Sequence, residues 1–480
     1  MKSIKSLFSL ALICIAFIPS ASAQIRLPQI IGDNMILQQK ANAKIWGWAS
    51  PGEVIKIKCS WNNQIVTATA SKDSSWTAYL KTPEGSYASQ KISIASEKNK
   101  TDKINLRNIL IGEVWFASGQ SNMEMPLNGF TNCPVAGANQ EIAFSGEYKN
   151  KIHFVTIPKT AARTPQKEVE GKWKEASPET SPWFSATGWF FATTLNKSLN
   201  VPIGIINCSW GGSKVEGWLN EETLKNYPDI DLSKVPNQKY NVHYLTPLVM
   251  YNGMAHPLIG YTIQGIIWYQ GESNIGKSHT YADRLSTLIK LWRSEWKQGD
   301  LPFYYVEIAP FNYGGNNQGA LLREAQYKVQ NMVTNCGMIS TNDLVSDYEL
   351  NQIHPHNKKA VGERLAYMAL HNTYNEKFVE CRGPEYQSMS IDGDKAIIKF
   401  KYDDNGFNRS NEIKGFEIAG SDSIFHPANA TVDATQKTVI VNSSEVKVPI
   451  AVRYAFKDFS IGNFANTREL PAVPFRTDNW

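Results

Sequence analysis

The feature that most constrains the fold is the stretch from residue 109 to residue 382, in which short apolar runs alternate with longer segments of helical periodicity. The runs lack the polar alternation of a half-exposed strand, so they are typical of strands buried on both faces. Such strands separated by helices predict an α/β fold with a parallel sheet covered on both sides. The expected strands are Val114–Ala117, Ile203–Asn207, Ile263–Tyr269, Phe303–Ile308 and Met338–Ser340, and the expected helices lie near 187–199, 279–296, 319–333 and 356–371.

The segments on either side of this stretch are typical of β structure. Residues 24–108 contain alternating runs such as Ala43–Gly47 and Val54–Cys59, separated by turn signals such as Pro51-Gly52, which predicts a small antiparallel sandwich. Short β runs return after residue 383. Because 480 residues are too many for one hydrophobic core, we predict three domains: a β-sandwich over 24–108, an α/β domain over 109–382 and a β-rich domain over 383–480.

The N-terminus carries the signature of a secretory signal peptide. Lys2 and Lys5 precede an apolar run from Leu7 to Ile18, and Ala21-Ser22-Ala23 follows it. The apolar run is too short to span a membrane. We therefore predict cleavage after residue 23, export to the periplasm or the outside of the cell, and no stable membrane insertion.

Charge and cysteine content narrow the classes of partner and cofactor. The net charge of +5 is spread over the chain without a run of like charges, which argues against a nucleic-acid partner. Five cysteines follow the signal peptide, an odd number without the C-x-x-C spacing of a zinc site. Disulfide pairing and oligomeric state stay open, and no metal or organic cofactor is expected.

Two motifs lie directly after predicted strands and carry a serine and a pair of glycines. Gly119-Gln120-Ser121-Asn122 would project the Ser121 hydroxyl above the sheet edge, with backbone N–H groups free to stabilise an oxyanion; a helix cap is the alternative. Gly211-Gly212 follows the strand ending at Asn207 and offers a second N–H; an ordinary tight turn is the alternative.

Two further motifs supply polar groups at the same edge. Trp268–Asn274 places polar residues at the end of an apolar strand: Gln270 could donate its amide N–H to an oxyanion, and Glu272 and Asn274 are candidate supporting residues. His354 lies before a proline and a predicted helix, and a lone histidine is often structural. Together the four motifs supply a nucleophile, two oxyanion donors and a base at one sheet edge, which is the inventory for acyl transfer.

These residues resemble the sialate O-acetylesterase-like family of bacterial carbohydrate esterases, within the SGNH hydrolases. The resemblance extends over nearly the whole mature chain. It includes Asn34–Gln38, Trp46–Ala49, Gly112–Trp115, Ser118–Glu124, Gly211-Gly212, Trp268–Asn274, Arg323–Gln326, His354-Pro355, Lys414–Gly420, Val452–Tyr454 and Pro474–Arg476.

The resemblance implies a flavodoxin-like three-layer catalytic sandwich and a serine esterase acting on acetylated sugars. It implies that Ser121 is the nucleophile, that His354 is the base, and that the N–H groups of Ser121 and Gly212 and the side chain of Gln270 form the oxyanion hole. Acetylated sialic acid, acetylated xylan or another glycan is the expected substrate. Arg284 and Arg323 are candidate partners for the carboxylate of sialic acid, although a structural role is the more ordinary one for each.

One position departs from the family pattern, which commonly has an acidic residue two or three places before the histidine. Asn351 and Gln352 occupy those places here, and the nearest upstream acids are Asp343, Asp347 and Glu349. Three explanations are open: a Ser–His dyad oriented by a neutral group such as Gln352, a displaced acid, or a weakened enzyme. Two other functions also stay open, namely a lipid- or thioester-directed esterase and a glycan-binding protein with a decayed site.

Overall fold

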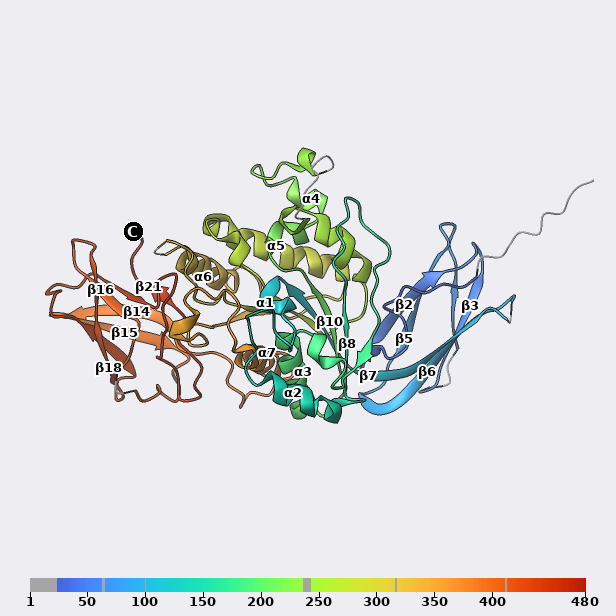
Figure 1. The fold of residues 1–480 in the computed structure, drawn as a ribbon, viewed down its shortest axis with the longest axis horizontal. Helices are drawn as coiled ribbons and strands as arrows, with labels where there is room; N and C mark the ends of the chain where they lie inside the picture. The colour runs from blue at the N-terminus through green and yellow to red at the C-terminus, as the bar shows by residue number, and fades with distance from the viewer. Residues whose placement is uncertain (1–23, 63–64, 100, 236–242, 316, 411) are drawn as a thin grey trace, which may run out of the picture.

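The computed structural model describes residues 24–480 except 63–64, 100, 236–242, 316 and 411, and the predicted signal peptide lies outside the described residues. The molecule is elongated, with three parts side by side along its longest axis (Figure 1). The N-terminal β strands lie at the right, the α/β part in the middle and the C-terminal β sheets at the left. Among the described residues, no helix has the length and hydrophobicity needed to cross a membrane.

The α/β part is built on a mixed sheet with strand order β13-β12-β11-β7-β10-β8-β9. All neighbours on this path are parallel except β8 and β9. Every residue of β10, β11 and β12 is buried, as expected of a sheet covered on both faces. The strands are β7 (Lys103–Gly119), β8 (Ile152–Thr156), β9 (Lys174–Glu175), β10 (Ile203–Ser209), β11 (Gly265–Tyr269), β12 (Phe303–Val306) and β13 (Cys336–Ile339).

The five predicted parallel strands are therefore confirmed, and β8 is an additional one. Its five residues include His153 and Thr156, so they do not form the purely apolar run that marked the other strands. His153 is nevertheless fully buried, because its Nδ1 lies 2.6 Å from the carbonyl oxygen of Asn34. That hydrogen bond satisfies one of the two ring nitrogens inside the sheet, and the other, Nε2, lies 3.7 Å from the Glu175 carboxylate.

Helices cover both faces of this sheet. Alternate residues of β7 point in opposite directions: Trp115 packs against Phe191 of α3 with ring centroids 5.1 Å apart, and Phe116 packs against Trp292 of α5 at 5.6 Å. The helices of one face are α3 (Ala186–Leu199) and α7 (Lys358–Asn372), and those of the other are α5 (Ser278–Trp296) and α6 (Gln318–Val329). All four helices were expected from the sequence.

The N-terminal strands join the central sheet through β7. The first part of β7 pairs antiparallel with β6, and its second part pairs in parallel with β10 and β11. The boundary predicted at 108/109 thus falls within one continuous strand, and the division into domains stays a prediction. The other strands here are β1 (Ile36–Gln38), β2 (Asn42–Trp48), β3 (Val54–Cys59), β4 (Ile65–Thr69), β5 (Ser75–Lys81) and β6 (Ser86–Ser96); β1 pairs in parallel with β7, so the pairing is not wholly antiparallel.

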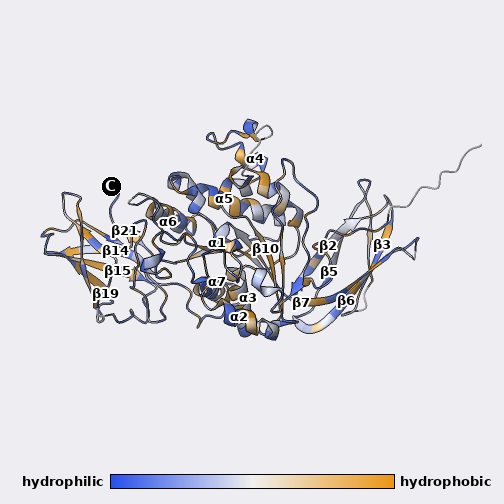
Figure 2. Cartoon of the chain, in the orientation of Figure 1, coloured by the Kyte–Doolittle hydropathy of each residue, from blue (hydrophilic) through white to orange (hydrophobic). Residues whose placement is uncertain are grey.

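The C-terminal part consists of two antiparallel four-stranded sheets around their own hydrophobic core. Figure 2 shows hydrophobic residues along the strands of all three parts of the molecule. Asp458 links this part to the helical layer by accepting a hydrogen bond of 2.6 Å from the backbone N–H of Gly319 in α6. One sheet contains β14 (Glu385–Asp392), β15 (Lys395–Lys401), β19 (Thr438–Asn442) and β18 (Asn429–Asp433), and the other β17 (Phe425–Pro427), β16 (Phe416–Ala419), β20 (Ala451–Tyr454) and β21 (Phe475–Arg476).

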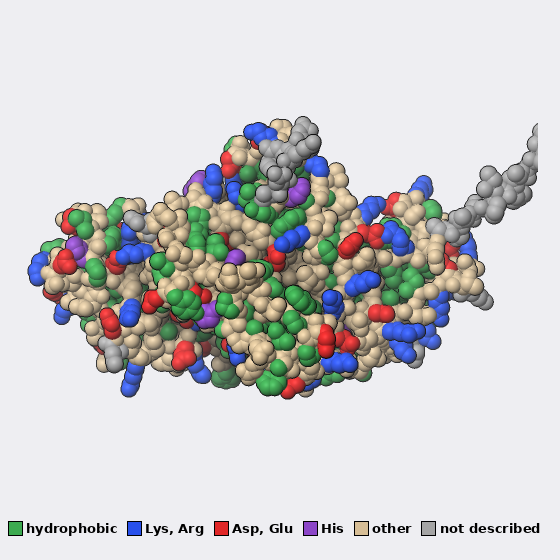
Figure 3. Space-filling view, viewed as in Figure 1, with side chains coloured by type: hydrophobic (Ala, Val, Ile, Leu, Met, Phe, Trp, Pro, Cys, Tyr) green, Lys and Arg blue, Asp and Glu red, His purple; other side chains and the backbone are tan. Residues whose placement is uncertain are grey.

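On the face drawn in Figure 3, acidic and basic side chains are interspersed over all three parts. The five cysteines that the structure describes are all unpaired: Cys59, Cys133, Cys208, Cys336 and Cys381. Within the described ranges, no group of three or more His, Cys, Asp or Glu side chains is arranged to hold a metal ion.

Candidate active site

The serine, glycine and glutamine motifs meet where three parallel strands end. In the sheet register, Gly119 at the end of β7 lies opposite Ser209 of β10 on one side and Tyr269 of β11 on the other. Parallel neighbours bring their carboxyl ends to one edge, so the segments that follow these strands converge there. The expected convergence of the three motifs is therefore observed.

Ser121 is presented by a tight connection between β7 and the short helix α1 (Ser121–Glu124). Gly119 has a φ of +134°, and a β-carbon there would lie 2.1 Å from the carbonyl oxygen of Tyr269, so only glycine fits. The buried side chain of Gln120 accepts hydrogen bonds from the backbone N–H groups of Gly271 and Ser273 at 3.2 and 3.4 Å. These contacts fix the turn and leave the serine side chain partly exposed at the sheet edge.

His354 reaches Ser121 from the loop that precedes α7. Its Nε2 lies 2.8 Å from the Ser121 Oγ, within the range expected of a nucleophile and its base. Burial, reinforced by the nearby Lys358 cation, lowers the pKa of His354 to about 4. The imidazole is thus neutral over most of the pH range and can accept the proton of the hydroxyl.

The backbone N–H groups of Ser121 and Gly212 lack a hydrogen-bond acceptor within the described part of the chain. The glycine turn is close to the serine, since a β-carbon on Gly211 would lie 3.2 Å from the Ser121 Cβ. The N–H of Gly211 itself donates to the Glu124 carboxylate at 2.5 Å, which pins the turn to α1. This arrangement offers two donors of the kind that stabilise an oxyanion.

Gln270 does not fit the oxyanion role expected from the sequence. Its side chain is completely buried, and its amide nitrogen already donates to the Ser213 carbonyl at 3.0 Å and to the Asn274 Oδ1 at 2.7 Å. Its amide oxygen accepts from the Tyr281 hydroxyl at 2.9 Å. With both amide hydrogens engaged, none is left for an oxyanion, and the prediction is corrected: Gln270 holds the segment after Gly212 in place.

Glu272 and Asn274 connect the motifs to one another. Glu272 Oε1 accepts a hydrogen bond of 2.6 Å from the amide of Asn122, the residue after the nucleophile. Burial raises the pKa of Glu272. Asn274 Oδ1 accepts from the backbone N–H of Val215 at 3.1 Å as well as from Gln270. Both residues therefore support the turns that present the reacting groups.

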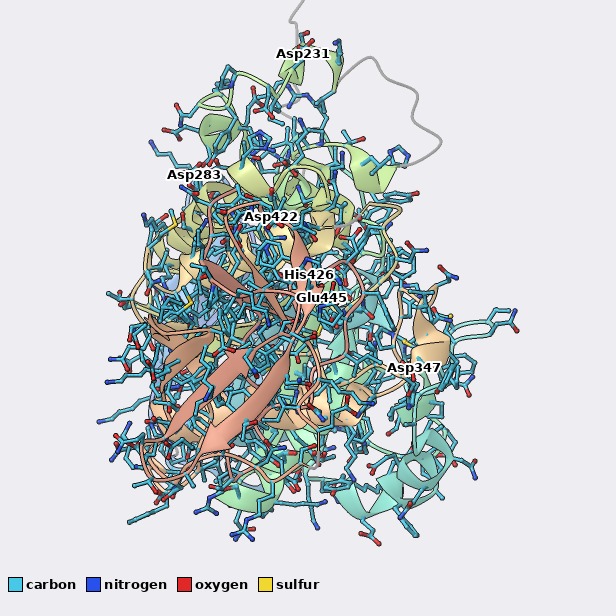
Figure 4. All side chains as sticks on the ribbon, turned by 90° about the vertical axis from the view of Figure 1, so that its left-hand side faces the viewer. Asp231, Asp283, Asp347, Asp422, His426 and Glu445 are labelled. Atoms are coloured by element: carbon cyan, nitrogen blue, oxygen red, sulfur yellow. The ribbon has the colours of Figure 1, made fainter. Side chains whose placement is uncertain are left out.

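In the part of the chain that the structure describes, no carboxylate is hydrogen-bonded to the ring of His354. Asp343 forms two hydrogen bonds with Arg364, at 2.7 and 2.5 Å, and Glu349 lies 2.9 Å from His356 Nδ1. Asp347 is exposed and lies at the edge of the molecule in Figure 4. Gln352 Oε1 accepts from the His354 backbone N–H at 3.2 Å and does not contact the ring nitrogens. None of the three upstream acids is hydrogen-bonded to His354.

Two residues near the reacting pair were not singled out by the motifs. Lys358 of α7 is completely buried, and its ammonium donates to Asn122 Oδ1 at 2.8 Å and to the Pro355 carbonyl at 2.7 Å. Burial lowers its pKa to about 7. Lys358 thereby joins the turn after the nucleophile to the turn after the base. The other residue is Cys133, whose Sγ lies 3.9 Å from His354 Nδ1.

The two arginines considered for a substrate carboxylate are structural. Arg284 is buried and paired with Glu216 and Asp229. Arg323 is buried against the C-terminal part, where it bonds to the Lys457 carbonyl. Both guanidiniums are thus engaged by groups of the fold.

Comparison with known proteins assigns the chain to a family. Residues 111–371 match the family described as carbohydrate esterase, sialic acid-specific acetylesterase. These residues include Ser121, Gly212 and His354, and they make up more than half of the chain. The chain belongs to this family. It is therefore an ester hydrolase that acts on carbohydrate esters.

Two kinds of relative extend the match beyond the α/β part. The human sialate O-acetylesterase is 26% identical over 495 aligned residues, covering 95% of this chain and 93% of that protein. The mouse sialate O-acetylesterase is also 26% identical and covers 98% and 97%. The crystal structure of a carbohydrate acetylesterase from Xanthomonas citri superposes with a TM-score of 0.84 at 32% identity, covering 95% of this chain and all of that one. The family likeness thus includes both β flanks.

Proposed function

We propose that this carbohydrate esterase removes O-acetyl groups from sugars through an acetyl-enzyme formed on Ser121. The observation that carries the proposal is the 2.8 Å contact between Ser121 Oγ and His354 Nε2. A hydroxyl is a weak nucleophile until a neighbouring base accepts its proton, and this contact supplies that base. The same contact argues against a decayed, purely glycan-binding site, because the reacting pair is intact.

The reaction follows from the groups around this pair. His354 takes the proton of Ser121 as Oγ attacks the acetyl carbonyl carbon. The N–H groups of Ser121 and Gly212 stabilise the oxyanion of the tetrahedral intermediate. The carbon–oxygen bond to the sugar then breaks, and His354 returns its proton to the departing alcohol. A water molecule deprotonated by His354 attacks the acetyl-serine, and acetate leaves as Oγ regains the proton.

The base acts in a Ser–His dyad. A carboxylate partner would raise the pKa of the imidazole by stabilising its charged form, whereas burial and Lys358 hold the pKa of His354 low. A neutral histidine remains competent as a base far below neutral pH, but its conjugate acid is less stabilised. This supports the dyad over the displaced-acid alternative, because Asp343 and Glu349 are engaged by Arg364 and His356.

Acetylated sialic acid is the substrate we propose. The family description and the mammalian relatives both name sialate acetylesters. Acetate release from acetylated sialic acids, acetylated xylan and nitrophenyl esters of increasing chain length tests the proposal. We expect short acetyl esters of sialic acid to be preferred; a preference for long acyl chains would favour a lipid-directed esterase.

The matched control for that panel is Ser121→Ala. Its hydroxyl is the attacking group, so acetate release from every ester should be lost. The unfolding temperature should be kept, because the residue is partly exposed and alanine differs from it only by the hydroxyl. Full acetate release by Ser121→Ala would overturn the proposed mechanism.

The wider context of the site is also a proposal. When the additional strand β8 is left out of the count, the strands β10-β7-β11-β12-β13 have chain order 2-1-3-4-5, the order of flavodoxin-like sheets, which supports the three-layer SGNH hydrolase sandwich. We propose the catalytic domain to be residues 109–382, flanked by β domains over 24–108 and 383–480. The basic and apolar pattern of residues 1–23 supports export, with the acetylated glycan met outside the cytoplasm.

A further inference from the structure

A tight turn formed by residues 129–133 lies against the catalytic histidine. Phe130 and Cys133 exchange two backbone hydrogen bonds, at 3.0 and 2.9 Å. Gly129 has a φ of +75°, and a β-carbon there would lie 2.4 Å from the Cys133 carbonyl oxygen. Asn132 also has a positive φ, +59°. The conformation of the turn is therefore closely determined by its backbone, which sets the directions in which its side chains leave the main chain.

Two side chains of this turn contact the imidazole. The ring of Phe130 meets the His354 ring edge to face, with centroids 5.2 Å apart and an angle of 70° between the planes. Cys133 Sγ lies 3.9 Å from His354 Nδ1. Among the described residues, this sulfur is the hydrogen-bonding partner of Nδ1, the ring nitrogen that a triad acid would contact.

The thiol is itself oriented by a neighbour. Gln352 Oε1 accepts the thiol hydrogen at 3.4 Å and also accepts from the His354 backbone N–H at 3.2 Å. With its hydrogen turned to Gln352, the sulfur presents a lone pair to Nδ1–H. A hydrogen on Nδ1 leaves the lone pair of Nε2 directed at the Ser121 hydroxyl, which is the tautomer that a general base needs.

We propose that Cys133 is a positioning residue that stands where the acid of a triad would stand. It holds His354 in the tautomer and orientation that accept the Ser121 proton, and Gln352 holds the thiol. The proposal rests on the proposed function, since it assigns a role relative to the Ser121–His354 pair. A contact of 3.9 Å is long, as hydrogen bonds of a catalytic site often are before substrate binds.

None of the charged side chains near His354 places a carboxylate against Nδ1, so the only group facing this nitrogen among the described residues is the neutral thiol of Cys133. Lys358 approaches from α7 and lowers the pKa of His354. Glu272 lies behind Asn122, to which it is bonded, and Glu349 is bonded to His356. Because none of these carboxylates faces Nδ1, a carboxylate placed at position 133 would be the first to do so.

Comparing Cys133→Ala with Cys133→Ser tests the positioning role. We expect Cys133→Ala to lower kcat by roughly 5- to 10-fold, the effect of one hydrogen bond to a neutral group, with KM unchanged. Cys133→Ser replaces the thiol by a hydroxyl, which can still bond to Nδ1, and should recover part of that loss. The matched control is Cys336→Ala, a second half-buried free thiol that bonds only to backbone carbonyls; it should leave kcat unchanged.

Equal kcat in Cys133→Ala, Cys133→Ser and the unsubstituted enzyme would overturn the proposal, and so would equal losses in both variants, which would indicate packing alone. Ser121→Ala separates this failure from that of the proposed function. If Ser121→Ala is inactive while Cys133→Ala is fully active, only the role of Cys133 is refuted.

A charged substitution gives an independent readout that does not depend on Cys133→Ala folding. Cys133→Asp places a carboxylate toward Nδ1, which stabilises the imidazolium and raises the pKa of His354. The acid limb of the kcat/KM–pH profile should therefore move to higher pH. An acid limb that stays where it is in the unsubstituted enzyme would show that position 133 does not face the catalytic imidazole.

Discussion

The serine side and the histidine side of the site are built in different ways. Ser121 and Gly212 follow strands of one sheet, and buried side chains such as Gln120 and Gln270 bind their turns directly. His354 lies in a loop, and its Nδ1 is met by Cys133, 221 residues earlier in the chain. The nucleophile is thus positioned by the sheet, and the base by a long-range contact. Substitutions on the serine side should therefore cause large losses of activity, whereas substitutions around His354 should cause smaller, graded losses.

The largest effect outside the reacting pair is expected from Gly212→Ala on the serine side. Gly212 has a φ of +78°, and a β-carbon there would lie 2.9 Å from the ring of Tyr244. The turn would have to move and would take its N–H away from the oxyanion, so kcat should fall by about 10²–10³-fold. Steady-state kinetics with an acetyl ester measures this.

The matched control for that change is Gly137→Ala. Gly137 has a similar φ of +71°, but a β-carbon there would meet nothing within 4 Å. Both variants suffer the same backbone strain, and only Gly212→Ala should lose activity. Equal losses of kcat in the two would mean that Gly212 is needed for folding and not for the oxyanion.

The next change sharpens the corrected role of Gln270. Gln270→Ala removes the buried hydrogen bonds that its side chain makes with the Ser213 carbonyl, Asn274 and the Tyr281 hydroxyl. Asn274 Oδ1 keeps the Val215 N–H, and the Tyr281 hydroxyl keeps the carbonyl of residue 270. The free energy of unfolding should fall by about 1–3 kcal/mol, measured by urea denaturation. The fall in kcat should be smaller than that of Gly212→Ala. A loss of activity as large as that of Gly212→Ala, with stability unchanged, would return Gln270 to the oxyanion hole.

Lys358 connects the two sides, and Lys358→Met should change how the activity depends on pH. Its ammonium lowers the pKa of His354, so its removal should raise that pKa and move the acid limb of kcat/KM to higher pH. Lys359→Met, the exposed neighbour, is the control and should leave the limb in place. An unmoved acid limb in Lys358→Met would show that the lysine does not act on the base.

The same lysine predicts a pH dependence of stability. The pKa of Lys358 falls from 10.5 to about 7 on folding, so between these values the unfolded chain binds more protons than the folded one. The contribution of Lys358 to the free energy of unfolding should therefore rise with pH from about 7 to about 10.5. Lys358→Met should remove this slope, and urea denaturation across that range measures it. A slope that persists in the variant would have to come from another group.

The smallest effect is expected from Asp347→Asn on the histidine side. The side chain is exposed and is not bonded to His354, so kcat and the unfolding temperature should both stay unchanged. A loss of kcat in Asp347→Asn would mean that Asp347 acts as the displaced acid. The base would then be positioned by a carboxylate, and the histidine side would not differ from the serine side as described.

The sequence predicted the strands, helices and serine side of the site better than the contacts of the histidine side. The four helices and five of the parallel strands were predicted because a sheet buried on both faces requires uninterrupted apolar runs, and β8 was missed because His153 interrupts its run. Ser121 and Gly212 could be placed because parallel strands end at one edge. The engaged amide of Gln270 could not be foreseen, since it depends on Ser213 and Asn274 being close in space. Cys133 gave no signal, because its turn meets His354 only through the tertiary fold.

The most direct test of the account is the site and rate of fluorophosphonate labelling. Mass mapping of the labelled enzyme should place the adduct on Ser121, because His354 makes this hydroxyl nucleophilic. In His354→Gln the same adduct should form about 10³-fold or more slowly, since the base that activates the serine is gone. An adduct on another residue, or an unchanged labelling rate in His354→Gln, would contradict the central claim that Ser121 and His354 act as one unit.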